Sequence, residues 1–277
     1  MSRKAKPGKP KELFGELSRP GPHRVLRGDL ALVGLPGSVF TPESGLSLPA
    51  VAFGHGWLQS VDRYHGLLRH LASWGIVVAA PSTQRGPLAS HRLFASDLRT
   101  ALDVCTGVRL GEGKISVDPG RLGLAGHSTG GGSAVLAGAA DERIRGIATV
   151  SVAEVRPSAV EAAARCAMPG LHLAAGRDLI APAAAHAEAI ATNWAGPVQL
   201  RTLPKASHLG ITEGWHWSQL LLDGKGERAT QRATKVLLAA FFLVHLVGAD
   251  RYRPLLDEDV KGAVVDYAHE PTIAKAG

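Results

Sequence analysis

Residues 126–130 read GHSTG and fit the G-x-S-x-G motif, in which the central serine, here Ser128, acts as a nucleophile. An apolar strand is expected at 121–125, directly before the motif, and a helix of small residues at 129–140, directly after it. Glycine on both sides suits the sharp turn, because a β-carbon at either position would collide with neighbouring chain. The pattern therefore predicts a serine lifted above the edge of a sheet, beside the free N–H groups that begin a helix.

A serine hydroxyl is a poor nucleophile at neutral pH and needs a histidine base. Six histidines follow the serine in the chain: His172, His186, His208, His216, His245 and His269. His208 lies in a short loop after a strand expected at 198–203, where a base at a strand end belongs. His216 is the second candidate, while the others are expected within strands, within helices or near the end of the chain.

The base in turn needs a carboxylate that orients it. Asp178 follows a strand expected at 170–175, in the same manner as the histidine follows its own strand. Glu154 is the alternative, because it also comes at the end of a strand, expected at 144–152. Asp141 and Glu142 are expected at the far end of the helix after the serine, and should face the opposite edge of the sheet.

Backbone N–H groups must also face the negative charge that develops on the substrate oxygen. Thr129, directly after the serine, should supply one of them. Trp57, in the turn after a strand expected at 49–54, should supply the other, and its ring should line the acyl pocket. Gly56 allows the chain to approach closely there, and His55 is interpreted as a hydrogen-bonding residue that fixes the loop.

Strands and helices alternate along most of the chain, which indicates a mostly parallel sheet with helices on both faces. The predicted organisation is a flexible basic tail at 1–20, one α/β domain at 21–267 and a C-terminal tail at 268–277. The segment between the strands expected at 144–152 and at 170–175 is too short for a lid domain.

The net charge of +7 lies almost entirely in residues 1–27, which hold eight basic and two acidic residues. Because a nucleic-acid-binding domain carries its excess charge on a folded face, no nucleic-acid partner is expected. No HxxxH, CxxC or GxxxxGK spacing is present, so no metal and no cofactor are expected. Cys105 and Cys166 are interpreted as two buried thiols in a reducing compartment, although one bridge stays open as an alternative.

The N-terminal basic residues are followed by no apolar run of the kind that a secretory signal contains, and a cytoplasmic location is expected. The longest apolar stretch, residues 236–247, is too short to span a bilayer and contains His245, so it is interpreted as part of a core helix.

Several motifs resemble the α/β-hydrolases that include cutinases, polyester hydrolases, chlorophyllases and dienelactone-hydrolase-like esterases. They are FGHGW at 53–57, LASWGIVVAAP at 71–81, RLGLAGHSTGGG at 121–132, GRDLIAP at 176–182 and ASH at 206–208. The resemblance covers roughly residues 30–255 and implies an α/β-hydrolase fold. It also implies a serine carboxylic ester hydrolase with Ser128, Asp178 and His208 as its triad, and with Trp57 and Thr129 as its oxyanion donors.

The chain departs from the polyester-degrading members at residues 153–155, where those members carry a tryptophan and this chain reads AEV. Glu154 would then lie near the substrate and repel acidic substrates. The expected substrates are therefore small or lipid-like esters with short to medium acyl chains, with little action on solid aromatic polyester. An acyltransferase or thioesterase with the same triad, or a non-catalytic binding protein of the same fold, are the alternatives.

Overall fold

A nine-stranded sheet runs through the computed structural model, which describes residues 9–215 and 226–269. Its strands are β1 (Val25–Asp29), β2 (Gly37–Pro42), β3 (Gly45–Gly54), β4 (Val77–Pro81), β5 (Ile115–His127), β6 (Ile144–Val150), β7 (Gly170–Ala175), β8 (Val198–Leu203) and β9 (Val264–His269). Their order across the sheet is β1-β2-β4-β3-β5-β6-β7-β8-β9. The strands from β4 to β8 are parallel neighbours, and the pairings of β1 with β2, β2 with β4 and β8 with β9 are antiparallel. The prediction of a mostly parallel sheet is confirmed.

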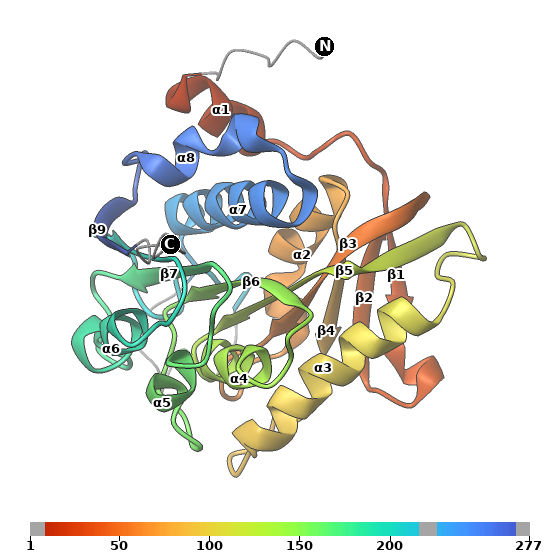
Figure 1. Cartoon of the computed structure of the whole chain (residues 1–277), viewed down its shortest axis with the longest axis horizontal. Coiled ribbons are helices and arrows are strands. Elements are labelled where there is room, and N and C mark those ends of the chain that lie inside the picture. The colour runs from red at the N-terminus through yellow and green to blue at the C-terminus, as the bar shows by residue number, and fades with distance from the viewer. Residues whose placement is uncertain (1–8, 216–225, 270–277) are drawn as a thin grey trace, which may run out of the picture.

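Helices cover both faces of this sheet (Figure 1). One face carries α1 (Pro10–Leu17), α2 (His65–Ser73), α7 (Arg228–Phe242) and α8 (Pro254–Asp257). The other face carries α3 (His91–Gly107), α4 (Thr129–Gly138), α5 (Ala159–Ala163) and α6 (Ala187–Thr192). This arrangement, with crossover helices between parallel strands, is the α/β-hydrolase architecture that the sequence predicts.

The two helical layers pack against alternate residues of the same strands. In β3, Val51 and Phe53 belong to the core under α2 and α7, while Ala50 and Ala52 belong to the core under α3 and α4. Successive side chains of a strand point to opposite faces, so a central strand covered on both sides must be apolar throughout. This coverage on both faces explains why the strand appears in the sequence as a continuous apolar run.

Part of the segment predicted to be a flexible tail is a packed helix. Residues 1–8 lie outside the described residues, but α1 buries Leu13, Phe14 and Leu17 against α7 and α8. Apolar residues one and four positions apart form a stripe on one side of a helix, which this core covers. Tyr252 fixes the helix further, because its hydroxyl donates to the Glu16 carboxylate over 2.8 Å. At the other end of the chain, β9 extends two residues into the segment predicted to be a tail.

The long apolar helix near the C-terminus lies between α1 and the sheet. Arg228–Val247 has the length and the mean hydropathy, 1.2, of a membrane-spanning helix, but 72% of its apolar window is buried inside the protein. Its last turn, Leu243–Val247, is a π-helix. The surface that an isolated helix would present to lipid is here covered by the protein's own residues, so the helix belongs to the core.

Both cysteines are free and buried, as predicted. Cys105 lies in α3 and Cys166 follows α5. Burial raises the pKa of both thiols to about 12, because the charged thiolate loses its solvation there.

His172 generates a prediction about acid stability. It is fully buried in β7, and its Nδ1 lies 2.8 Å from Thr149 Oγ1. Burial lowers its pKa to about 3, whereas a histidine in an unfolded chain titrates near about 6.5. Between these values the unfolded chain binds a proton that the folded protein does not, so this histidine should lower the free energy of unfolding by about 1 kcal/mol from pH 6 to pH 5.

The measurement is urea unfolding at pH 7, 6 and 5 for the wild type and for a Thr149→Val/His172→Leu variant, which removes both partners. From pH 6 to pH 5, the free energy of unfolding of the variant should fall by about 1 kcal/mol less than that of the wild type, because one group fewer takes up a proton on unfolding. An identical pH slope for the two proteins would show that His172 is protonated in the folded state.

Candidate active site

Ser128 lies in the turn between β5 and α4 with φ 53° and ψ −126°, a backbone conformation that residues with a β-carbon rarely adopt. Hydrogen bonds to neighbouring segments hold it there. Its N–H donates to the carbonyl of Val150 at the end of β6, and its carbonyl accepts from the N–H of Ala153. The strain is thus balanced by bonds to the adjacent strand and the loop that follows it.

Three glycines make this turn possible by letting backbones approach one another. A β-carbon on Gly130 would lie 2.3 Å from the backbone of Gly54 at the end of β3. A β-carbon on Gly126 would lie 2.4 Å from the carbonyl oxygen of Gly130. The ends of β3 and β5 and the first turn of α4 therefore meet at distances that exclude any side chain.

The structure brings together the three side chains that the sequence singles out. His208 Nε2 lies 2.9 Å from Ser128 Oγ, and His208 Nδ1 lies 2.8 Å from Asp178 Oδ2. Because a carboxylate only accepts, Nδ1 carries the proton, and Nε2 of the neutral ring is free to accept from the serine hydroxyl. The three residues follow β5, β7 and β8, whose carboxyl ends lie along one edge of the sheet.

Asp178 is held by more than the histidine. Its Oδ1 accepts hydrogen bonds from the N–H groups of Ile180 and Ala181, over 3.0 and 2.8 Å. Burial raises the pKa of this carboxyl, but the hydrogen bond and the charge of His208, together with the two N–H groups, outweigh burial and bring the pKa below its usual value. The carboxylate is therefore ionised at neutral pH.

A small pocket of about 120 Å³ opens beside the serine hydroxyl. It is lined by Gly56, Trp57, Gln59, His127, Ser128, Thr129, Ala153, Ile180, His208 and Leu209. Both predicted oxyanion residues, Trp57 and Thr129, lie in this wall. Within the described part of the chain, no hydrogen-bond partner is present for the backbone N–H of either residue, so both groups are available to an oxygen of a bound molecule.

The loop that carries Trp57 is fixed on both sides. The two ring nitrogens of His55 lie 2.9 Å from the carbonyl oxygen of Gly56 and 2.8 Å from that of Thr83, which agrees with its interpretation as a loop-fixing residue. The indole N–H of Trp57 donates to the carbonyl of Pro87 over 3.3 Å, and 38% of this residue is exposed. The ring is thereby held at the pocket's rim.

The structure places Glu154 outside the residues that line the serine pocket. The carboxylate of Glu154 accepts from the N–H of Val160 in the first turn of α5, and its own N–H donates to His186 Nδ1. Ala153, one residue earlier, lines the pocket instead. A carboxylate near a helix N-terminus satisfies free N–H groups there, and this local bond holds the Glu154 carboxylate at the start of α5. His216, the second candidate for the base, lies outside the described residues.

Two buried polar residues of the site have no place in the sequence prediction. They are Tyr64 and His127, of which the second stands at a variable position of the G-x-S-x-G motif. In the structure Tyr64 Oη lies 2.8 Å from His127 Nδ1, and both residues are 0% exposed. The sequence does contain one indication of this pair. A histidine stands directly before the nucleophile, and if that histidine is buried, it must have a hydrogen-bond partner.

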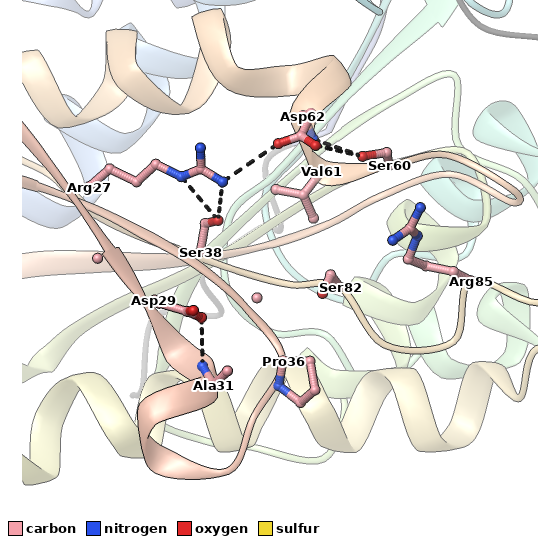
Figure 2. A pocket seen from close by; sticks show the side chains of 12 residues that line it. Arg27, Asp29, Ala31, Pro36, Ser38, Ser60, Val61, Asp62, Ser82 and Arg85 are labelled. Atoms are coloured by element: carbon pink, nitrogen blue, oxygen red, sulfur yellow. Dashed lines mark hydrogen bonds and ion pairs between the residues drawn. The ribbon is translucent and has the colours of Figure 1, made fainter.

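A more polar hollow of about 500 Å³ lies beside β1 and β2 and shares no lining residue with the serine pocket (Figure 2). Arg27 reaches Ser38 and Asp62 there, and Asp29 accepts from the N–H of Ala31. Its acidic groups are thus already engaged by the protein's own donors, and we assign the chemistry to the smaller pocket. Within residues 9–215 and 226–269, no group of three or more His, Cys, Asp or Glu side chains is placed to hold a metal ion.

Comparison with known proteins identifies one family. A family model described as PETase: PET hydrolase-like matches residues 21–211. The matched region runs from β1 beyond β8 and contains Ser128, Asp178 and His208, while α7, α8 and β9 follow it. A search of curated proteins found no match.

The close approach at the turn predicts the effect of one added methyl group. Gly130→Ala should lower the free energy of unfolding by about 3 kcal/mol or more, because backbone atoms only 2.3 Å away cannot move aside as a flexible side chain can. Gly15→Ala in α1 is the control, since its β-carbon would meet nothing within 4 Å and should be neutral or stabilise by up to about 1 kcal/mol. Urea unfolding of both variants checks this, and a Gly130→Ala protein with wild-type stability would contradict it.

Proposed function

Because the chain belongs to the PET hydrolase-like family, whose members are serine ester hydrolases, we propose that it hydrolyses short- to medium-chain carboxylic esters through an acyl-enzyme intermediate. The observation that carries the proposal is the continuous hydrogen-bonded chain from Ser128 Oγ through His208 to Asp178, with links of 2.9 and 2.8 Å. A serine, a neutral imidazole and an ionised carboxylate in this order form the arrangement that activates a hydroxyl for attack on a carbonyl carbon.

In the first half of the proposed reaction, Ser128 Oγ attacks the ester carbonyl while His208 Nε2 takes its proton. The charge of Asp178 stabilises the imidazolium that results. The N–H groups of Thr129 and Trp57 donate to the oxyanion of the tetrahedral intermediate. As the intermediate collapses, His208 returns the proton to the departing alcohol, and the acyl group stays on the serine.

In the second half, a water molecule replaces the alcohol. His208 takes a proton from this water as the water oxygen attacks the acyl carbon. The N–H groups of Thr129 and Trp57 then donate to the second oxyanion. Proton return to Ser128 Oγ then releases the carboxylic acid. The protein's own residues suffice for each step.

The size of the pocket supports short acyl groups. At about 120 Å³, the pocket is smaller than those that hold drug-sized ligands. The walls contributed by Ile180, Leu209 and Trp57 suit an alkyl chain. The segment between β6 and β7 carries only α5, so this described segment adds no lid domain, and Trp57 at the pocket is partly exposed.

The family match also favours a second candidate substrate, an aromatic polyester. Against it stands the segment 153–155, which reads AEV where the resemblance implies a tryptophan in polyester-degrading members, and whose Ala153 lines the pocket. Stacking of an aromatic ring on such a side chain is worth about 0.5–1.5 kcal/mol, or about two- to tenfold in affinity. We therefore propose soluble esters as the preferred substrates, and parallel assays on nitrophenyl butyrate and on a polyester film compare the two.

The triad generates the central test. Ser128→Ala and His208→Ala should each lower kcat on nitrophenyl butyrate by on the order of 10⁶, while Asp178→Ala should be milder because the imidazole still acts when poorly oriented. Circular dichroism controls for folding, and a serine-reactive phosphonate should inactivate the wild type with one equivalent per chain. Retention of more than about a tenth of the activity in Ser128→Ala would remove Ser128 from the mechanism.

The pocket wall generates a test of substrate size. Ile180→Ala removes atoms that line the pocket and should shift the best nitrophenyl ester toward longer acyl chains. Leu179→Ala is the matched control, because the neighbouring leucine is 79% exposed and lies outside the lining. kcat/KM across acetate to decanoate esters is the measurement. A chain-length profile that both variants share with the wild type would show that this pocket does not receive the acyl group.

A further inference from the structure

A buried chain of hydrogen bonds joins the loop with the predicted oxyanion donor to the backbone of the predicted base. The N–H of Gly56 donates to Tyr64 Oη over 3.1 Å. Tyr64 Oη lies 2.8 Å from His127 Nδ1, and His127 Nε2 lies 2.9 Å from the carbonyl oxygen of His208. Tyr64 and His127 therefore connect the Gly56 loop to the His208 loop, two segments that are far apart in sequence.

The chemistry of the two ends fixes the direction of every bond in this chain. The carbonyl oxygen of His208 can only accept, so His127 Nε2 carries a proton. Burial lowers the pKa of His127 to about 3, and the nearby charge of His208 adds to this, so the ring holds one proton only and its Nδ1 is an acceptor. Tyr64, whose pKa is raised by burial, must then donate to Nδ1, and its oxygen accepts from Gly56.

These hydrogen bonds leave the N–H of Trp57 for the substrate. The N–H of Gly56 is engaged by Tyr64, whereas the next one along, that of Trp57, has no partner among the described residues. The fit is tight as well, because a β-carbon on Gly56 would lie 2.8 Å from His127 Nδ1. A shift of the tyrosine hydroxyl would therefore move the peptide that carries the Trp57 N–H.

We infer that Tyr64 and His127 are positioning residues of the active site, which together hold the Trp57 N–H toward the oxyanion and His208 toward Ser128. The inference rests on the proposed function and deepens it. Tyr64 lies outside the pocket lining and does not touch the substrate, so its hydroxyl should act on the reacting geometry and leave binding almost unchanged.

Tyr64→Phe removes only the hydroxyl and should lower kcat on nitrophenyl butyrate by about 10- to 100-fold, with KM within about twofold of wild type, since small displacements of catalytic groups cost rates of this size. Tyr252→Phe is the matched control. Tyr252 is also buried, and its hydroxyl donates to the Glu16 carboxylate. Removal of this hydroxyl should leave kcat unchanged. Phosphonate titration gives the active fraction, so kcat is counted per reactive serine.

His127 allows a test of the bond directions. His127→Gln offers an acceptor oxygen and a donor NH2 group, which can replace the acceptor and the donor nitrogen of the neutral imidazole, and should keep kcat within about threefold of wild type. His127→Phe offers neither and should lose about as much as Tyr64→Phe. The double variant Tyr64→Phe/His127→Phe should lose little more than either single variant, because one chain of bonds is broken in all three.

Two outcomes would overturn the inference. One is a Tyr64→Phe protein with a lowered melting temperature and an unchanged kcat, which would show that the hydroxyl stabilises the fold and does not position the reacting groups. The other is a His127→Gln protein as impaired as His127→Phe. Ser128→Ala separates this failure from that of the proposed function, because a fully active Ser128→Ala protein would place the esterase chemistry elsewhere, whatever Tyr64→Phe shows.

Discussion

The site depends on how closely three backbone segments approach one another at the nucleophile turn. Gly54, Gly126 and Gly130 meet at distances at which a β-carbon would lie 2.3 to 2.7 Å from the opposite backbone. This contact holds the first turn of α4 against the ends of β3 and β5, and Ser128 has to adopt its positive φ to connect them. The energy of that strain is offset by hydrogen bonds to Val150 and Ala153, so the hydroxyl is held in place before any substrate arrives.

The rest of the site follows from the parallel sheet. Parallel strands all end at the same edge, so the residues that follow β5, β7 and β8 are brought together there although they lie far apart in sequence. The layers of helices on both faces exclude water from the strands, and the polar groups at the edge must find partners within the protein. Asp178 illustrates this requirement, because both of its carboxylate oxygens accept hydrogen bonds from residues of the site.

Much of this arrangement can be predicted from the sequence, because strand ends are visible as the ends of apolar runs. The strands at 170–175 and 198–203 have the predicted bounds, and that precision is why Asp178 and His208 could be chosen among several candidates. The prediction fails where a local interaction decides. The edge strand β9 has an exposed, mixed pattern that periodicity does not reveal, and α1 owes its order to the core beneath it. Glu154 ends a strand just as Asp178 does, yet a single bond holds its carboxylate at the start of α5.

The two histidines at the nucleophile show how the environment gives one residue type two different roles. Their ring centroids lie 5.0 Å apart. A positive charge on His127 would oppose protonation of His208 by about 3 kcal/mol at this distance, with an effective dielectric constant of about 20. In the proposed reaction, this cost would fall on the step in which His208 takes the serine proton. The hydroxyl of Tyr64 donates to His127, and the carbonyl of His208 accepts from it, so the buried ring has all its bonds satisfied in the neutral form. The same partners that orient the site therefore also keep a competing charge out of it.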